Sequence, residues 1–280
     1  MRRVSVIQTT NRVQIMPQTL LSNAVASAGR FQVDQLPVRL CPDRPTLARE
    51  AASMAHGHLS ETLRRQGHAA VILATGNSQI QFLDELVKLG GIDWSVVTLF
   101  HMDEYLGISA NHTASFRRYM KEKVESRVSP KAFHYLIGDA AEPIQECERY
   151  SRLLGAQPID LCCMGVGENG HIAFNDPPVA NLNDPLRVKI VQLDHACRMQ
   201  QVGEGHFPSL EAVPQYALTL TIPALCSARK IICICPETRK AKAVKAMLQG
   251  PVDSACPASA LRHQPQATLF LDPDSAALLS

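Results

Sequence analysis

The chain has 280 residues, with 28 basic against 26 acidic side chains and 46% hydrophobic residues. This is the composition of a globular protein, and the near-balance of charge excludes the domain-wide basic field that nucleic-acid-binding proteins use. No apolar run reaches the roughly 18 residues that span a bilayer, so neither nucleic acid nor a membrane is an expected partner.

Nine cysteines are scattered along the chain without any CxxC pair. Four of them, Cys162, Cys163, Cys233 and Cys235, lie in apolar runs, where a thiol behaves as a small hydrophobic side chain. The pattern predicts neither a disulfide framework nor a metal centre. It favours a reducing compartment, and the expected location is the cytoplasm.

The first 33 residues contain no acidic side chain, and arginines are interspersed there with Ser, Thr, Gln and Asn. Neither a sustained helical period nor a secretory hydrophobic region is present. We therefore predict that residues 1–35 form an N-terminal extension that is partly ordered at best. A single domain is expected to occupy 36–280, with folded structure beginning near Leu36.

From Leu36 onward, hydrophobic runs alternate with segments whose apolar residues recur at helical spacing. In chain order the pattern predicts a helix at 46–65, a strand at 69–73, a helix at 80–89, a strand at 96–100, helices at 116–124 and 141–154, strands at 159–164, 189–193, 216–221 and 230–235, a helix at 239–248 and a strand at 268–271. Strands that are hydrophobic throughout are typical of a mostly parallel sheet with helices on both faces. We expect one three-layer α/β/α domain with a Rossmann-like sheet, and a ligand site beyond the carboxyl ends of its strands.

A polar turn, Thr75-Gly76-Asn77-Ser78, joins the strand at 69–73 to the next helix. Backbone amides at such a helix start, together with two hydroxyl groups, make an anion site that suits a phosphate. The turn is not a Walker loop, because the second glycine and the lysine are missing. Taken alone, the same residues also fit a simple strand-to-helix turn with a helix cap.

An acidic pair, Asp103-Glu104, follows the strand at 96–100. Two adjacent carboxylates at a strand end point in different directions, so one of them can face the site while the other caps or pairs elsewhere. A carboxylate beside the apolar Phe100 and Met102 can have a raised pKa, which suits a general base. The alternative for an Asp-Glu pair is a solvated loop.

The most informative segment runs from Gly165 to Pro177 and follows the strand at 159–164. Its three glycines, Gly165, Gly167 and Gly170, allow close backbone approach and positive φ angles beside His171. The residues able to fix the tautomer of this histidine are Glu168, Asn169 and Asp176. The dinucleotide-binding fingerprint fits poorly, because no amphipathic helix follows and no acidic residue stands at the usual distance.

Taken together and in this order, the segments resemble those of the glucosamine-6-phosphate deaminase (isomerase) family. Members of that family carry a TG-containing phosphate loop, an MDEY segment and a G-x-G-x-[DN]-G-H-I-A-F-N-[ED]-P segment. Further on, 193–198 (LDHACR) is similar to the family's segment with a phosphate-binding Arg, and 239–241 (RKA) to its phosphate-binding Lys segment. The likeness extends from about Leu36 to Ser280.

The resemblance implies a cofactor-free enzyme, a homo-oligomer, that converts glucosamine 6-phosphate and water to fructose 6-phosphate and ammonia. In that reading Asp103 moves the C2 proton toward C1, and His171 assists opening of the pyranose ring. Asp176 takes the position of the family's Glu that completes the histidine relay. The residues that would hold the phosphate are Thr75, Gly76, Asn77, Ser78, Arg198 and Lys240.

The chain departs from the family pattern beside the histidine, where Asn169 replaces the usual Asp. An amide can orient an imidazole but cannot stabilise an imidazolium as a carboxylate does, and Glu168 is the alternative source of that charge. Regulated members also use a Ser-containing segment after the FNEP motif, where this chain has Val179-Ala180. Only Arg187 and Lys189 remain as basic counterparts there, so we expect no activation by a sugar phosphate.

Two alternative functions stay open at the level of sequence. The related 6-phosphogluconolactonases share the fold and a G-x-G-x-D-G-H core, which favours lactone hydrolysis, but they continue with ASLFP-like residues where this chain has IAFNDP at 172–177. A non-catalytic sugar-phosphate sensor is the other alternative, because Asn169 weakens the expected chemistry. The sugar epimer, glucosamine or galactosamine 6-phosphate, is also open.

Overall fold

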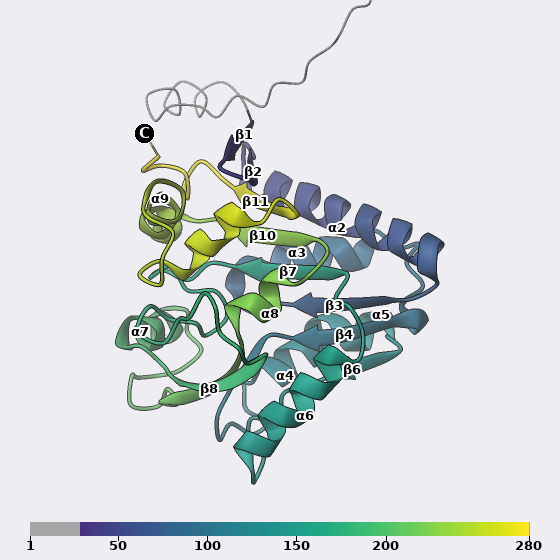
Figure 1. Ribbon diagram of the computed structural model, residues 1–280, viewed down its shortest axis with the longest axis vertical. Helices are drawn as coiled ribbons and strands as arrows, with labels where there is room; N and C mark the ends of the chain where they lie inside the picture. The colour runs from purple at the N-terminus through teal and green to yellow at the C-terminus, as the bar shows by residue number, and fades with distance from the viewer. Residues whose placement is uncertain (1–28, 280) are drawn as a thin grey trace, which may run out of the picture.

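The computed structural model describes residues 29–279, and the greater part of the expected N-terminal extension, residues 1–28, lies outside them. Within the described part, a large sheet has the strand order β1-β2-β11-β10-β7-β3-β4-β6 (Figure 1). Its strands are β1 (Arg30–Val33), β2 (Leu36–Leu40), β3 (Ala69–Leu73), β4 (Val97–His101), β6 (Ala132–His134), β7 (Leu161–Gly165), β10 (Ile231–Cys235) and β11 (Ala267–Leu271). β1 and β2 pair antiparallel, and every other neighbouring pair is parallel, which confirms the predicted sheet.

Helices cover both faces of this sheet, which confirms the predicted three-layer domain (Figure 1). One face packs against α2 (Arg44–Gln66), α3 (Asn77–Lys88), α4 (Phe116–Met120), a π-helical turn (Lys121–Glu125) and α5 (Ser126–Val128). The other face packs against α6 (Pro143–Gly155), α8 (Ile222–Cys226), α9 (Ala241–Gln249) and a 3-10 segment (Pro257–His263). Shorter 3-10 turns precede β4 (Trp94–Val96) and α9 (Thr238–Lys240).

The first long helix shows how local sequence sets the element boundaries. The side chain of Asp43 accepts a hydrogen bond from the backbone N–H of Thr46 at the start of α2, and Pro45 lies in the first turn. Gly67 ends the helix with a φ of 74°, a left-handed conformation that costs glycine little. Between these ends one face is buried against β3, β7 and β10, through Leu47, Ala48, Ala51, Ala52, Ala55, Leu59 and Thr62.

Two strands predicted for the main sheet belong instead to a separate antiparallel sheet. This smaller sheet has the order β5-β9-β8, with β5 (Asp103–Tyr105), β8 (Val188–Gln192) and β9 (Tyr216–Leu220). Leu218 and Leu220 pack into the main core, whereas Ala217 packs with α7 (His195–Gly203) in a second small core. Because β9 is covered on both sides, its sequence is as hydrophobic as that of a parallel strand.

Folded structure begins earlier than the predicted Leu36. Arg30–Val33 pairs with Leu36–Leu40 through a tight turn at Asp34, whose φ is 50°. The carboxylate of Asp34 also pairs with Arg262, which joins this hairpin to the C-terminal part of the domain. Only Phe31 and Val33 alternate as apolar residues in this short strand, so the local pattern is too weak to predict it.

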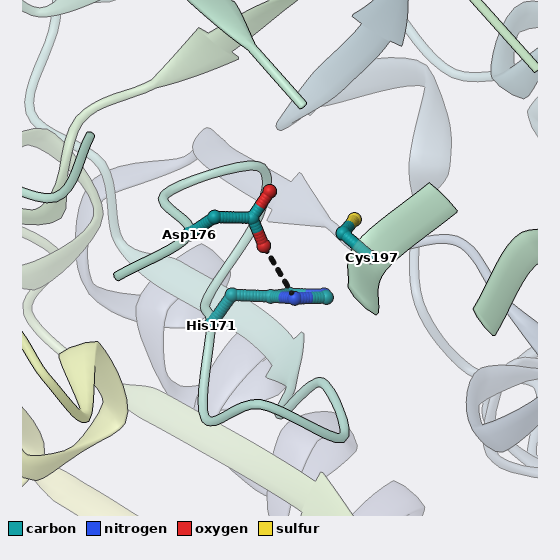
Figure 2. Close-up of side chains that lie close together, drawn as sticks. All are labelled: His171, Asp176 and Cys197. Atoms are coloured by element: carbon teal, nitrogen blue, oxygen red, sulfur yellow. Dashed lines mark ion pairs between the residues drawn. The ribbon is translucent and has the colours of Figure 1, made fainter. Parts of the chain in front are cut away.

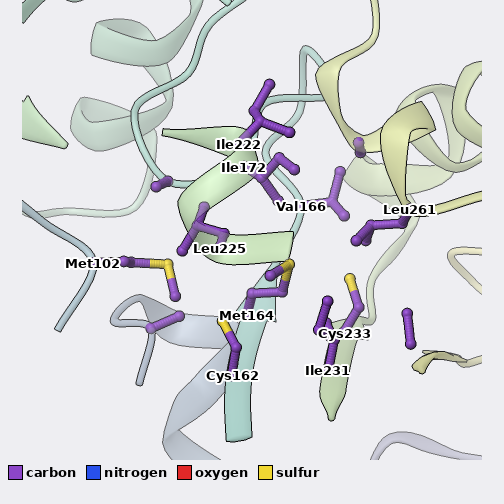
Figure 3. Packing of buried hydrophobic residues seen from close by; sticks show 14 of the residues in the cluster. Met102, Cys162, Met164, Val166, Ile172, Ile222, Leu225, Ile231, Cys233 and Leu261 are labelled. Atoms are coloured by element: carbon purple, nitrogen blue, oxygen red, sulfur yellow. The ribbon is translucent and has the colours of Figure 1, made fainter. Parts of the chain in front are cut away.

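The apolar segment 222–226 and the helix after Thr238 bear on the expected homo-oligomer, because apolar helix faces pack either against another subunit or into the core of their own chain. Ile222, Leu225, Val244 and Met247 are buried in the core of this chain, where Figure 3 shows Ile222 beside Ile172 and Leu225 nearer to Met164. These residues therefore give no support to the expected homo-oligomer, which remains a prediction.

The described residues contain no helix long and apolar enough to cross a membrane. All nine cysteines are free thiols, and all except Cys226 are buried. This agrees with the prediction that the chain has no disulfide framework.

Candidate active site

Four adjacent strands end at one edge of the sheet, and the loops that follow them enclose a small cavity. The strands are β10, β7, β3 and β4, and the cavity has a volume of about 80 Å³. Its walls include residues from four of the five predicted motifs, all except the 193–198 segment, and from α7, namely Ala74, Thr75, Gly76, Asn77, Ser78, Met102, Asp103, Phe116, Gly165, Val166, Gly167, His171, Ala173, Phe174, Gln200, Gln201, Glu204 and Lys240. We call this space the site cavity. Its position is the one expected for a ligand of a parallel α/β sheet.

The turn after β3 brings the N-terminus of α3 to the site cavity. Gly76 is the N-cap residue with a φ of 98°, a backbone conformation that L side chains rarely adopt. No side chain caps the helix start, so the first N–H groups of α3 are left for another partner. Thr75, Asn77 and Ser78 line the same wall. The positive end of the helix dipole makes this wall attractive to an anion.

Lys240 also lines the site cavity, from the 3-10 turn that follows β10. Its side chain is buried, with only 3% of the residue exposed, and burial lowers the pKa of its ammonium group. Within residues 29–279, its ammonium group has no hydrogen bond or ion pair to another side chain or carbonyl. A buried ammonium group that opens onto a cavity and has no hydrogen bond or ion pair among the described residues indicates an anionic ligand.

Asp103 presents a buried carboxylate to the site cavity from the start of β5. Burial and the neighbouring Glu104 raise the pKa of Asp103 well above the ordinary range of an aspartate. Its Oδ1 atom has no hydrogen-bond partner among the described residues. An under-solvated carboxylate of this kind is a stronger base than a surface aspartate, as predicted for one member of the acidic pair.

Glu104 is not in a solvated loop, because its residue is fully buried. Its carboxylate accepts hydrogen bonds from the Ser115 hydroxyl at 2.8 Å and from the backbone N–H groups of Phe116 and Arg117 at 3.1 and 3.0 Å. The Arg117 guanidinium lies 3.3 Å away. Glu104 therefore fixes the start of α4 against β5, and this leaves Asp103 as the carboxylate that faces the cavity.

The glycines of the loop after β7 make room for His171. A Cβ atom on Gly167 would lie 2.1 to 2.3 Å from the imidazole ring, and one on Gly170 would lie 2.8 Å from the sulfur of Cys256. A Cβ atom on Gly165 would lie 3.1 Å from the side-chain nitrogen of Gln79. Figure 3 shows Val166 and Ile172, on either side of the loop, directed into the hydrophobic core. The loop is thus anchored at both ends while the histidine lines the cavity.

Two oxygen atoms define the tautomer of His171. Its Nδ1 lies 2.7 Å from Oδ1 of Asn169 and 2.9 Å from Oδ1 of Asp176. The amide oxygen of Asn169 also accepts from the backbone N–H of His171, and the amide nitrogen donates to Asp176 at 3.0 Å. Both oxygens that face Nδ1 are acceptors, so Nδ1 carries the proton. In the neutral ring Nε2 is then free to accept a proton.

Asp176 supplies the negative charge behind this histidine. Burial alone would raise its pKa, but hydrogen bonds from His171, Asn169 and the backbone N–H of Asp194 keep the pKa of Asp176 below its ordinary range. The sulfur of Cys197 lies within 4.8 Å of a carboxylate oxygen of Asp176 and of a ring nitrogen of His171. Figure 2 shows the three side chains of His171, Asp176 and Cys197 converging.

The same three residues are the one group in the described part of the chain whose ligand atoms could hold a metal ion, since these atoms lie within 4.8 Å of one another. Nδ1 of His171, however, is already directed at Asn169. The hydrogen bonds among His171, Asn169 and Asp176 explain why these side chains lie together, with Asp176 placed behind the imidazole as in a proton relay.

Two predicted site residues lie elsewhere. The Arg198 guanidinium is not on the cavity wall, because its Nη2 donates to the backbone carbonyls of Leu210 and Val213 at 2.6 and 3.0 Å. It holds the segment after α7 in place. Glu168 is turned away from His171 and pairs with Arg239 at 3.2 Å, so Asn169 and Asp176 are the residues that face the imidazole.

Three side chains that no motif in the sequence singles out also line the site cavity, from α7 and its C-terminal cap. Gln200 accepts from the backbone N–H of Glu168 at 3.0 Å, and Gln201 accepts from the Tyr105 hydroxyl at 2.7 Å. Glu204 lies on the same wall as Lys240. The signal available in the sequence was the polar run 200–206 immediately after the Arg198 segment.

The uncapped start of α3, Lys240, the buried carboxylate of Asp103 and the histidine backed by Asp176 meet at one cavity, an arrangement suited to an α/β enzyme that acts on a small anion. The chain belongs to the family of glucosamine-6-phosphate isomerases and 6-phosphogluconolactonases, whose model matches residues 42–270. A glucosamine-6-phosphate deaminase from Listeria monocytogenes serotype 4a (strain HCC23) is 37% identical over 207 residues, which cover 74% of this chain and 86% of the relative. The corresponding protein from Exiguobacterium sibiricum is 34% identical over 236 residues, 83% and 90% of the two chains. These matches confirm the resemblance stated from the motifs.

Solved structures share the architecture. A monomeric glucosamine-6-phosphate deaminase superposes with a TM-score of 0.79 at 28% identity and covers 86% of this chain and 99% of its own. The 6-phosphogluconolactonase from Thermotoga maritima superposes with a TM-score of 0.68 at 19% identity, covering 84% and 98%. At that identity the lactonase shows the common fold alone.

Proposed function

We propose that this protein is a glucosamine-6-phosphate deaminase, which converts glucosamine 6-phosphate and water to fructose 6-phosphate and ammonia. The observation that carries the proposal is that one cavity contains both a buried lysine, Lys240, without a hydrogen bond or ion pair among the described residues, and a buried carboxylate with a raised pKa, Asp103. The first suits a phosphate, and the second suits removal of a proton from carbon. The names of the curated relatives support the same reaction.

The phosphate is held by the wall that contains the turn 75–78 and Lys240. Backbone N–H groups at the start of α3 donate to its oxygens, and the ammonium group of Lys240 neutralises part of its charge. Because these groups do not take part in the bond changes, their binding energy serves to position C1 and C2 of the sugar. Arg198 has no part in this proposal, since it does not line the site cavity and its Nη2 donates to two backbone carbonyls.

His171 opens the pyranose ring. Its free Nε2 takes the proton from the C1 hydroxyl, and the same proton passes to the ring oxygen as the bond between C1 and that oxygen breaks. During this transfer the ring is briefly an imidazolium, and the carboxylate of Asp176, 2.9 Å from Nδ1, stabilises the charge. Asn169 orients the ring through its 2.7 Å contact with the same nitrogen. The relay thus retains a carboxylate although Asn169 stands where the family has Asp.

Asp103 then performs the isomerisation. Its carboxylate removes the proton from C2 of the open aldehyde while O1 takes a proton from the substrate's own ammonium group, which gives an enolamine with a hydroxyl group on C1. Asp103 then returns the C2 proton to C1, and the product is a protonated ketimine at C2. Water adds to this carbon and nitrogen leaves as ammonium, so one water molecule supplies the ketone oxygen and two of the hydrogens carried away with nitrogen.

The test supplies purified protein with glucosamine 6-phosphate and measures ammonia and fructose 6-phosphate with separate coupled enzymes. We expect both products in equal amounts, and no ammonia from N-acetylglucosamine 6-phosphate, whose nitrogen is acylated. Galactosamine 6-phosphate in a parallel assay establishes the epimer. Absence of ammonia from both hexosamine phosphates overturns the proposal. Hydrolysis of 6-phosphogluconolactone above its spontaneous rate would indicate a lactonase, and tight hexose-phosphate binding without turnover would indicate a sensor.

A further inference from the structure

A second cation, Arg239, lies immediately before Lys240 and is surrounded by three carboxylates. Its Nε donates to Glu237 at 2.6 Å, and its Nη1 donates to Glu204 at 2.8 Å and to Glu168 at 3.2 Å. About 30% of its side chain is exposed, so it is neither a core residue nor a free surface residue. In the 239–241 motif only Lys240 is expected to bind the phosphate.

Glu204 brings a negative charge to the wall where the phosphate is expected. Its side chain is only 6% exposed, and it accepts hydrogen bonds from Gln200 at 2.8 Å and His206 at 3.3 Å. Burial alone would raise its pKa, but the hydrogen bond from His206 and the charge of Arg239 lower the pKa of Glu204 to about 2. It is therefore an anion at any physiological pH, and it interacts electrostatically with Lys240 as well.

An anion inside a site for an anion requires an explanation. A phosphate that binds to the start of α3 and Lys240 meets the carboxylate of Glu204, which lines the same wall. Either the phosphate and the Glu204 carboxylate repel each other, or the carboxylate moves away when the phosphate binds. The site cavity, at about 80 Å³, is well below the roughly 300–1,000 Å³ of typical small-molecule sites, so part of its wall has to move when a sugar phosphate enters.

The backbone around Glu204 permits such a movement. Glu204 is the cap at the C-terminal end of α7 and lies between Gly203 and Gly205. A Cβ atom on either glycine would have no heavy atom within 4 Å, so these positions are not packed against the rest of the protein. Gly205 has a φ of 80°, which accounts for a glycine there, so Gly203 is the position that neither packing nor a positive φ explains, and it is suited to a hinge.

Glu237, by contrast, fixes the other side of the Arg239 guanidinium. Its backbone has φ 85° and ψ 141°, a region in which a non-glycine residue is strained. The strained residue holds Nε of Arg239 through one carboxylate oxygen and Arg44 through the other. The guanidinium therefore keeps its position at Nε, while the partner of its Nη edge can be exchanged.

We propose that Arg239 is the second cation of the phosphate subsite, and that Glu204 occupies its Nη edge until the substrate phosphate takes that place. The hinge at 203–205 then carries Glu204 away from the cavity as the phosphate binds. This inference rests on the proposed function, because it assumes a phosphorylated ligand at the wall of Lys240. It assigns to Arg239 the bidentate guanidinium contact that the sequence had assigned to Arg198.

Calorimetric titration with inorganic phosphate and with fructose 6-phosphate tests the exchange. Glu204→Gln removes the competing charge and is expected to tighten binding of both ligands about tenfold, whereas Arg239→Gln is expected to weaken it by about tenfold, in the range that one charge-assisted hydrogen bond is worth. In the Arg239→Gln background, Glu204→Gln is expected to gain less than about threefold, because the freed guanidinium is missing. Matched controls are Glu211→Gln, on an exposed position of the same segment, and Lys242→Gln, on an exposed position of α9.

Tighter binding by Glu204→Gln is a result that loss of structure cannot produce, so a purely structural role for this residue predicts the opposite. Unchanged or weaker binding by Glu204→Gln, or unchanged binding by Arg239→Gln, overturns the inference. If Lys240→Met abolishes binding while both other variants match the parent protein, the inference fails and the phosphate site stands. If the parent protein binds neither ligand, the proposed function fails as well.

Discussion

Replacing Asp103 by Asn separates catalysis from stability, because the structure predicts opposite effects on the two. The carboxylate is buried, its Oδ1 has no hydrogen-bond partner among the described residues, and burial together with Glu104 raises the pKa of Asp103. As the only base placed at C2 in the proposed reaction, it is expected to contribute about 10²–10⁴-fold to the rate. Asp103→Asn should therefore lower kcat for ammonia release by at least about 100-fold, the lower end of that range.

The same substitution should stabilise the folded protein at alkaline pH. A carboxyl group whose pKa is higher in the folded state stabilises the fold fully when the pH is below its pKa in the unfolded chain. This contribution is lost as the pH rises through its pKa in the folded state. The amide never ionises, so the variant escapes this loss. A buried polar group without partners costs about 1–3 kcal/mol, and more when charged, so we expect a gain of on the order of 1 kcal/mol above the raised pKa.

Thermal unfolding at pH 8 and pH 5 measures this difference. For a chain of this size about 1 kcal/mol corresponds to roughly 2–4 °C in Tm, so Asp103→Asn should unfold a few degrees higher than the parent protein at pH 8 and with a smaller advantage at pH 5. A variant that is inactive but less stable at pH 8 would contradict the placement of a buried, unpaired charge at this position. Retained ammonia release would contradict its role as the base.

Three further substitutions examine the residues around the reaction centre. Lys240→Met should raise KM by at least about tenfold, through loss of a charge-assisted phosphate contact, while raising the Tm of the ligand-free protein, because it removes a buried ammonium without a partner. Glu104→Gln should lower the free energy of unfolding in urea by about 1–3 kcal/mol, because an amide cannot accept all the bonds that now fix α4; an unchanged midpoint would show that these bonds matter little. Asn169→Asp should destabilise the protein by about 1–3 kcal/mol at pH 7 and less at pH 4, since the amide donates to the carboxylates of Asp176 and Asp194 and an aspartate there would repel both; equal losses at the two pH values would refute this reasoning.

The strand-end motifs could be predicted because their signals are local. β3, β4, β7 and β10 are short, mostly apolar runs, and each is followed within three residues by a glycine or a charged residue. A parallel sheet then brings these loops to one edge without further information. The need for a small residue at Gly167, against the ring of His171, follows from the same local geometry.

The errors concern contacts between distant segments. Arg198 was assigned from its segment, but its partners are the carbonyls of Leu210 and Val213, twelve and fifteen residues further along the chain. Glu204 and Arg239 form an ion pair although they are 35 residues apart in the chain. The residues around each of them contain no pattern that predicts this contact. β8 and β9 were placed in the wrong sheet because a strand covered on both faces has the same composition in either sheet.

The central claim is that the cavity between Lys240 and Asp103 binds glucosamine 6-phosphate and removes its amino group. The most direct test is the yield of ammonia and of fructose 6-phosphate, measured in the same reaction mixture, from purified protein and from its Asp103→Asn variant. The account predicts one ammonia for each fructose 6-phosphate from the parent protein and a rate at least about 100-fold lower from the variant. Equal rates from the two proteins, or no ammonia from either, would contradict it.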